Sequence, residues 1–497
     1  MQHKHTIKIL ILAFVLGCLN AKSQMPTSMY FLETIPQSNF MNAAMAPRCN
    51  TFIGLPSVYF NLQHNMPINT LLQKTDSGTV SFLSPYYDLG KLESKLGAGF
   101  NIRNNIVVTP ISFGVRLNKG YFTFAFSNKT EVNGTIPTDF FTIPNKHFFP
   151  TNTTYDFAGI GLDAQIYNEY AFGYSRNITR KLRVGGRFKI LQGLASVVSD
   201  VSKMQITTSE NLITNNEWNL NVNGDIYTSG PLTVIPKEDG TIDTLKIDEK
   251  LEGSDAMQLA TDYATNFSNL GFAFDMGATY TLNYSWSFSA AINNLGLIRW
   301  NNSLNSIHFN GDYEFGGLDL TGETIDSTEQ ATDELMDSIQ TVVNYHAENK
   351  AFITRPTTML HIGSQYNVSH YFSAGILSST SFNRNYFHQE FTLSANLNTF
   401  KGGLTTNLNY NIALNGEQYA GFGLAFKLLP IQFYLMLDHI PIVYANYNIY
   451  EDSEDIDPEK IPLPYDLRSF NVMVGLNLIF GAHGYKDSPK IDAYSEF

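Results

Sequence analysis

The sequence predicts an all-β fold: a closed antiparallel transmembrane β-barrel of about 14 strands, with 16 as the competing count. Long segments such as 468–481 alternate strictly between apolar residues and small or polar ones, as a strand with two unlike faces does. Only 15% of the 497 residues are charged and 13% are aromatic, whereas roughly a quarter of the residues in soluble proteins are charged. Short and long connections alternate along the chain, which is typical of barrels with tight periplasmic turns and long outer loops.

The N-terminus predicts export from the cytoplasm. Two lysines, an apolar run over 9–19 and small residues before Gln24 form a secretory signal peptide over residues 1–23. The stretch Val15–Cys18 is a partial lipobox, so lipidation of Cys18 is the alternative. Cleavage before Gln24 leaves Cys49 as a lone cysteine, which forms no internal disulfide. No later segment holds the roughly 18 apolar residues of a membrane-spanning helix.

After an N-terminal segment over 24–50, which we expect to act as a plug, the barrel occupies residues 51–481. Alternation continues through Phe272–Ile292, which is too long for one strand and predicts a turn near Asn283 with an odd-numbered loop. The alternation changes phase at Leu429–Pro430, which predicts a two-residue turn. We expect the other tight turns near residues 118–120, 176–181, 282–285, 367–370 and 399–403.

The last strand, 468–481, is expected to pair with the first, 51–63, and close the barrel. Its apolar face is predicted to meet lipid through Phe470, Val472, Val474, Leu476, Leu478 and Phe480. The tail 482–497 would then be periplasmic.

Longer segments separate these strands. Residues 64–105 are predicted to be a plug or a loop with a short helix at Tyr86–Leu96. The segments 201–268 and 300–355 are predicted to be long outer excursions, with extra hairpins at 216–228 and 303–316.

Polar residues on the inner face of neighbouring strands form a candidate site. A turn centred near Ile178 would place Glu169 opposite Arg187. Such residues either fill the barrel interior as a polar network or filter a permeating solute by charge. The expected lumen-facing set is Asp163, Gln165, Glu169, Arg183, Arg187, Lys189 and Asp275.

Other function classes find little support in the sequence. The run Glu451–Glu459 holds six carboxylates but lacks the ligand spacing of a calcium loop, which favours a solvated outer loop. Ser327–Tyr345 predicts a helix, either a lid or a helix packed on the barrel rim. We expect no metal, no cofactor and no enzyme activity, because no metal-ligand spacing or nucleophile–base pattern occurs. The formal charge of −13 argues against nucleic-acid binding.

Three stretches, Ile35–Leu62, Glu169–Gly193 and Asp275–Trp300, resemble a family of Gram-negative outer-membrane barrels of unknown function. They are similar, more distantly, to fatty-acid transporter barrels and to the barrel shuttle of the type IX secretion system. These relatives often have Asn-Pro-Ala where this chain has Asn42-Ala43-Ala44. The resemblance implies a barrel fold and a location in the outer membrane.

Two functions therefore remain open. The first is passive transport of hydrophobic or small solutes across the outer membrane, with membrane lipid and a hydrophobic small molecule as partners. The second is a non-transporting scaffold whose long outer loops bind secreted or cell-surface proteins. A lumen lined by aromatic residues and open to the side would favour transport, and a sealed, charge-filled lumen would favour the scaffold.

Overall fold

The computed structural model describes most of the chain. The described residues are 26–66, 70–75, 78–81, 86–97, 99–142, 152–209, 217–230, 232–236, 242–247, 265–315, 344–383, 386–414, 416–440, 444–449, 459–464 and 468–481. Five sequence predictions lie outside these residues, wholly or in large part: the signal peptide, the fate of Cys18, the helix at Ser327–Tyr345, the acidic loop at Glu451–Glu459 and the C-terminal tail.

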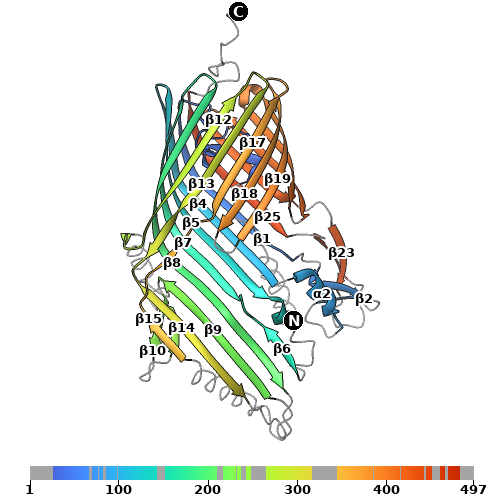
Figure 1. Cartoon of the computed structure of the whole chain (residues 1–497). Helices are drawn as coiled ribbons and strands as arrows, with labels where there is room; N and C mark the ends of the chain where they lie inside the picture. Colours follow the sequence, from blue (N-terminus) through green and yellow to red (C-terminus); the bar gives the residue numbers. More distant parts are fainter. Residues whose placement is uncertain are drawn as a thin grey trace, which may run out of the picture.

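The strands form a closed antiparallel barrel of 14 strands (Figure 1), which confirms the predicted fold class. Around the barrel they are β1 (Thr51–His64), β4 (Gly99–Leu117), β5 (Gly120–Pro137), β7 (Gly161–Asn177), β8 (Leu182–Ser209), β12 (Leu270–Thr281), β13 (Trp286–Trp300), β17 (Thr358–Asn367), β18 (Phe372–Asn383), β19 (Tyr386–Thr399), β20 (Leu404–Ala413), β21 (Gln418–Leu428), β22 (Ile431–Ile440) and β25 (Ser469–Phe480). As predicted, the last strand pairs with the first, with Thr51 opposite Phe480. Closure leaves no unpaired edge in the ring, which suits a sheet surrounded by lipid.

The tight turns fall where the alternation of the sequence predicts them. Thr281 pairs with Ser287, so residues of equal parity face each other across an odd-numbered loop. Leu428 pairs with Ile431, which confirms the two-residue turn and the change of phase. The other tight turns occupy 118–119, 178–181, 368–371 and 400–403.

Alternation in sequence becomes alternation in burial, as β25 illustrates. Asn471, Met473 and Asn477 are almost fully buried, whereas Val474 and Leu476 are 37% and 39% exposed. The six residues predicted to meet lipid are all half-buried or exposed, and each buried residue of the strand after Ser469 lies between two of them. The outward side chains along β25 are therefore all apolar, whereas its inward side carries polar residues together with Met473 and Ile479.

At the end away from the tight turns the sheet continues beyond the ring (Figure 1). β8 is 28 residues long and extends into the region predicted to be an outer excursion. It pairs there with β6 (Thr153–Asp156) and β9 (Glu217–Ser229), while β14 (Leu304–Phe315) joins β9 to β15 (Asn344–Glu348). The predicted separate hairpins at 216–228 and 303–316 are wrong, because each segment is a single strand and the two pair with each other.

Smaller elements lie around this rim. They are β2 (Leu72–Thr75), β3 (Gly78–Ser81), α2 (Leu89–Leu96), α3 (Thr138–Thr142), β10 (Leu232–Pro236), β11 (Ile242–Ile247), β16 (Phe352–Thr354), β23 (Tyr444–Ile449) and β24 (Glu459–Pro464). Met66, Tyr87, Leu92 and Leu96 form a small apolar cluster there with Phe100 and Phe141, so the 64–105 segment has a core of its own before β4 begins at Gly99. None of the helices in the described residues has the length and apolar character needed to span a bilayer.

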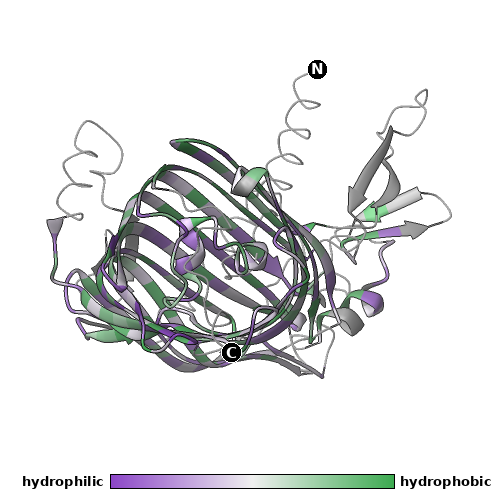
Figure 2. Cartoon of the chain, turned by 90° about the horizontal axis from the view of Figure 1, so that it is seen from above, coloured by the Kyte–Doolittle hydropathy of each residue, from purple (hydrophilic) through white to green (hydrophobic). Residues whose placement is uncertain are grey.

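The N-terminal segment lies inside the ring of strands (Figure 2). It contains two short 3₁₀ turns, η1 (Thr27–Met29) and η2 (Pro36–Phe40), and nearly every residue over 26–49 is buried. Eight-stranded barrels are filled by their own side chains, whereas rings of roughly 16 strands leave an open channel. A ring of 14 strands is wide enough to need additional filling, and we call residues 26–50 the plug.

Candidate functional site

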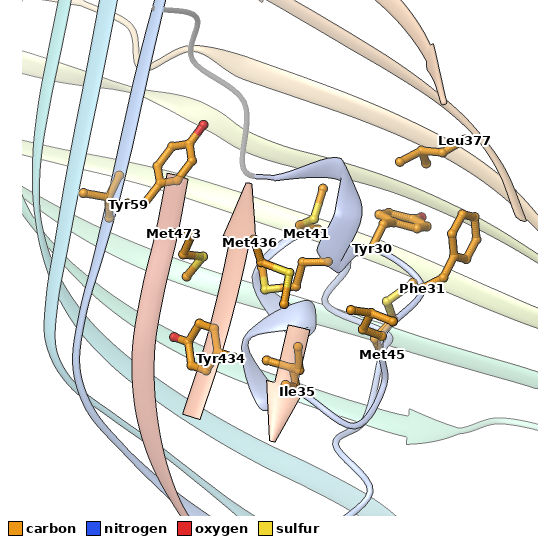
Figure 3. Packing of buried hydrophobic residues seen from close by; sticks show 14 residues of the cluster. Tyr30, Phe31, Ile35, Met41, Met45, Tyr59, Leu377, Tyr434, Met436 and Met473 are labelled. Atoms are coloured by element: carbon orange, nitrogen blue, oxygen red, sulfur yellow. The ribbon is translucent and has the colours of Figure 1, made fainter. Parts of the chain in front are cut away.

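The plug packs against the inner wall through a methionine-rich apolar cluster (Figure 3). The plug contributes Met29, Tyr30, Phe31, Leu32, Ile35, Met41 and Met45, and the wall contributes Tyr59, Val107, Leu377, Ala425, Tyr434, Met436 and Met473. Burial of one large apolar side chain contributes roughly 1.5–3 kcal/mol, so this cluster provides much of the plug's attachment. Methionine has three rotatable bonds and fits irregular surfaces, which allows the cluster to repack around a different neighbour.

Hydrogen bonds join both ends of the plug to the wall. At the end near the tight turns, Gln37 Nε2 donates to Asn477 Oδ1 (2.7 Å), and Asn477 Nδ2 donates back to Gln37 Oε1 (2.9 Å). At the other end, the Ser28 amide donates to Asp438 Oδ2 at 3.1 Å. Between them, Asn293 Nδ2 donates to the Met41 carbonyl at 2.7 Å. The plug is therefore held in one position by hydrogen bonds to several strands, and we call this position its seat.

Two wall glycines let the plug backbone approach closely. A Cβ at Gly185 would lie 2.1 Å from the carbonyl oxygen of Ala43, and one at Gly277 would lie 2.1 Å from Asn42 Oδ1. Only glycine leaves room for this contact. Asn42 Oδ1 also accepts a hydrogen bond from the Ala44 amide at 2.9 Å, and the Asn42 carbonyl accepts from the Met45 amide at 2.9 Å, so the plug backbone turns at this contact.

On one side of the lumen five buried charged residues form a continuous network, the charged wall: Lys129, Glu169, Arg187, Lys189 and Asp275. Glu169 Oε2 lies 2.7 Å from Lys129 Nζ and 3.5 Å from Lys189 Nζ. Asp275 Oδ2 lies 2.8 Å from Lys189 Nζ and 3.1 Å from Arg187 NH1. All five are at most 8% exposed, so each charge depends on its partners rather than on water.

The charged wall also holds the plug. Arg187 NH2 donates to the carbonyl oxygen of Asn39 at 3.0 Å and contacts Asn39 Oδ1 as well. The Phe40 ring lies 5.3 Å from the guanidinium carbon. Arg187 thus joins the wall network to the plug backbone.

The predicted pairing of Glu169 with Arg187 is wrong. Asn177 pairs with Arg183, which centres the turn on Arg180 instead of Ile178. The partner of Glu169 therefore becomes Leu191, and Arg187 lies opposite Gly173 on one side and Asp275 on the other.

The other predicted site residues lie apart from this network. Gln165 is buried and donates to Glu131 Oε2 at 3.2 Å. Arg183 is half-buried near the tight turns, where it donates to Ser175 Oγ at 3.1 Å, and Asp163 is half-buried further along β7. The sequence prediction missed Lys129 of the charged wall and Glu131, which is buried beside Gln165. The alternation of Phe122, Phe124 and Phe126 places the odd-numbered residues of β5 on the inner face, and this signal would have found both of them.

The opposite side of the lumen carries mostly neutral polar residues. Asn396, Asn407, Asn409 and Asn411, which we call the asparagine wall, form a chain of hydrogen bonds of 2.7–3.1 Å. The carboxylate of Asp438 accepts from Asn409 Nδ2 at 2.9 Å and from the plug residues Thr27 and Ser28.

Next to the asparagine wall, a carboxylate and two histidines form a second buried cluster. Glu390 Oε2 lies 3.0 Å from His439 Nε2 and 3.7 Å from His388 Nε2. His439 Nδ1 contacts Ser469 Oγ, and its backbone has a φ of 60° at an irregularity of the β21–β22 ladder. These residues come from three strands far apart in sequence and carry no local signature. Among the described residues, no group of three His, Cys, Asp or Glu side chains is arranged to bind a metal ion.

Fold and site together define a β-barrel whose lumen holds its own N-terminal segment. The chain belongs to a family of unknown function, DUF5723, which matches residues 44–438. This confirms the family predicted from the sequence. No protein of curated function matches the sequence.

Weak likenesses among solved structures include a toluene transporter, a monoaromatic hydrocarbon channel and a homologue of FadL. The toluene transporter TodX of Pseudomonas putida shares 10% identity at a TM-score of 0.39, covering 90% of this chain and 95% of that one. The monoaromatic hydrocarbon channel CymD shares 8% at 0.41, covering 90% and 94%. A Pseudomonas aeruginosa FadL homologue shares 11% at 0.38, covering 94% and 98%. These likenesses are weak and concern the fold alone.

Proposed function

We propose that this protein is a passive channel of the outer membrane that admits small hydrophobic solutes by displacement of the plug. The observation that carries the proposal is the methionine-rich cluster, an extended apolar contact between plug and wall inside a lumen whose charged wall and asparagine wall are polar. A hydrophobic solute that enters this region can replace plug side chains at little loss of burial, because both occupants are apolar.

The closed wall supports a route through the lumen. Every neighbouring pair of strands around the ring is joined by a ladder of backbone hydrogen bonds. A solute therefore has to pass along the axis, where the plug lies. The apolar outer face and the tight turns at one end are typical of outer-membrane barrels.

In this proposal the charged wall gives selectivity. Lys129, Glu169, Arg187, Lys189 and Asp275 satisfy one another, so a permeating ion would have to break existing ion pairs. A neutral solute meets no such barrier on the asparagine wall or in the methionine-rich cluster. Gln165, Arg183 and Asp163 line other parts of β7 and β8 and have a secondary role.

Dye uptake by Gram-negative host cells tests the proposal. The lipopolysaccharide leaflet slows the entry of hydrophobic compounds, so cells that produce the full-length protein should take up an uncharged hydrophobic dye such as N-phenyl-1-naphthylamine faster than cells without it. Toluene should compete, and hydrolysis of a hydrophilic β-lactam by periplasmic enzyme should be unchanged. Equal dye uptake with and without the protein would contradict the proposal.

A second candidate function is a scaffold for secreted or surface proteins. The sheet of β8, β9, β14 and β15 beyond the ring favours it, because this sheet offers a broad surface outside the membrane. A photo-crosslinking residue in place of the exposed Lys203 would test this function in living cells. Reproducible capture of one defined protein, together with no effect of the barrel on dye uptake, would favour the scaffold.

A further inference from the structure

Four exposed cations lie together on two neighbouring tight turns, and we call them the turn patch: Lys119, Arg176, Arg180 and Lys181. Lys119 belongs to the β4–β5 turn, and the other three lie at the β7–β8 turn. The two turns are adjacent because Gly120 pairs directly with Arg176.

No acidic side chain neutralises the turn patch in the described part of the chain, where the ion pairs of this end involve other residues. Glu33, the acidic residue of the plug, pairs with Arg48 at 2.5 Å. The tight turns at 282–285, 368–371, 400–403 and 429–430 contain neither Asp nor Glu. The turn patch therefore concentrates four positive charges whose N–H groups are exposed and available to an anionic ligand.

The turn patch continues the apolar outer face of the barrel. Phe172, Tyr174 and Arg176 follow one another on the outward side of β7, and the two rings are 41% and 46% exposed. Aromatic side chains of this kind gather at the boundary between hydrocarbon and headgroups. A cation one step beyond them is at the depth of lipid phosphates.

We propose that the turn patch binds the phosphate groups of an anionic phospholipid in the leaflet that the tight turns face. This inference rests on the membrane location proposed above. A ligand at this place contacts both the cations and the apolar outer face. A phospholipid matches the two surfaces, because its phosphate can bind the cations while its acyl chains cover the apolar face. An acidic protein would match the cations but leave Phe172 and Tyr174 uncovered.

The number and type of cations indicate the headgroup. Arg176 and Arg180 can each bind a phosphate through two N–H groups, whereas Lys119 and Lys181 act as point charges. Four cations exceed the charge of one phosphate diester. A headgroup with two phosphates, as in cardiolipin, is therefore expected to bind more tightly than phosphatidylglycerol, and both more tightly than zwitterionic phosphatidylcholine.

Native mass spectrometry of the full-length protein in mild detergent tests this inference. Cardiolipin, phosphatidylglycerol and phosphatidylcholine with matched chains are added at equal concentration. We expect the retained lipids to follow that order. The variant Lys119→Gln/Arg176→Gln/Arg180→Gln/Lys181→Gln should lose about tenfold or more of the cardiolipin bound, since each cation removed weakens the attraction to an anionic headgroup.

A matched pair of variants separates local binding from net charge. Lys119→Gln/Lys181→Gln and Lys203→Gln/Lys350→Gln remove the same charge, but Lys203 and Lys350 are exposed at the far end of the molecule. Only the first pair should lose cardiolipin. Equal loss from both pairs, or no preference of the wild type for anionic lipid, would overturn the inference. Displacement of cardiolipin by soluble polyglutamate at equal charge concentration would overturn it in favour of an acidic protein.

Dye uptake by the same variants keeps this inference distinct from the proposed channel. The turn-patch variants should take up the hydrophobic dye at the wild-type rate, because the patch lies outside the lumen. Loss of bound lipid with normal dye uptake supports lipid binding by the turn patch. Absence of dye uptake in all proteins, including the wild type, contradicts only the proposed channel.

Discussion

Two buried aspartates on opposite sides of the lumen belong to the two walls that hold the plug, and their surroundings differ. Asp275 on β12 is 1% exposed and is surrounded by the cations Arg187 and Lys189. Asp438 on β22 is fully buried and accepts hydrogen bonds from neutral groups, the Asn409 amide and the Ser28 backbone among them. The charged wall reaches the plug through Arg187 and Asn39, and the asparagine wall reaches it through Asp438.

Because one aspartate has charged partners and the other has neutral partners, the two walls should lose different amounts of stability when a side chain is substituted. A network of buried charges loses several kcal/mol when one member is removed, because the remaining charges keep their desolvation penalty. When one member of a network of neutral donors and acceptors is removed, the loss of stability is about the net free energy of the hydrogen bonds that it made. We therefore expect the charged wall to be rigid and the asparagine wall to tolerate movement of the plug.

The largest effect is expected from Asp275→Asn. The substitution leaves Arg187 and Lys189 without their shared carboxylate, and we expect the free energy of unfolding to fall by about 3–5 kcal/mol. Urea unfolding in phospholipid vesicles, followed by the fluorescence of the three tryptophans, measures this. Adding Lys189→Met to the variant should recover part of the lost stability, because it removes one of the two buried cations that have lost the Asp275 carboxylate. No recovery would mean that the loss has another cause.

Gly185→Ala is expected to have an intermediate effect. Its Cβ would collide with the backbone of Ala43, so the plug must shift, and overpacking of this kind costs roughly 1–3 kcal/mol. We expect faster dye uptake as well as lower stability. Gly186→Ala is the matched control, because a Cβ there meets no heavy atom closer than 3.8 Å. Equal behaviour of the two variants would contradict the plug's seat against β8.

Asp438→Asn is expected to have the smallest effect, about 1 kcal/mol. The amide oxygen of asparagine can still accept the hydrogen bond from Ser28, and no cation loses its ion-pair partner among those the structure describes. The same urea unfolding experiment compares it with Asp275→Asn. An equal loss in the two variants would remove the distinction between the walls.

The sequence predicted the barrel better than it predicted the site. Alternation over Phe272–Ile292 and the change of phase at Leu429–Pro430 sufficed to predict strands, turns and the inner face, because each is a local property of the chain. The closed 14-strand barrel followed from this alternation together with the loop lengths, and the family followed from the resemblance of Ile35–Leu62, Glu169–Gly193 and Asp275–Trp300. The contacts between the inward-facing residues were harder to predict from the sequence. An error of two residues in the turn centre moved the partner of Glu169 by four residues.

Contacts between distant segments lay beyond sequence reasoning. Asn39 and Arg187 are 148 residues apart, and Ser28 and Asp438 are 410 apart. The pairing of β9 with β14 likewise joins segments that each resembled a separate hairpin. The alternation of one strand fixes which residues point inward, but the plug that meets them is set by packing of the whole lumen.

The most direct test of the account is to lock the plug in its seat. Thr34 Oγ1 and Thr405 Oγ1 lie 3.0 Å apart, on the plug and on β20, so Thr34→Cys/Thr405→Cys in a Cys49→Ala background should form a disulfide. Dye uptake by host cells is then measured before and after reduction. We predict that the oxidised protein admits no more dye than cells without it, and that reduction restores uptake to the rate of the Cys49→Ala parent. Equal uptake by the oxidised and reduced protein would contradict the claim that solutes pass by displacing the plug.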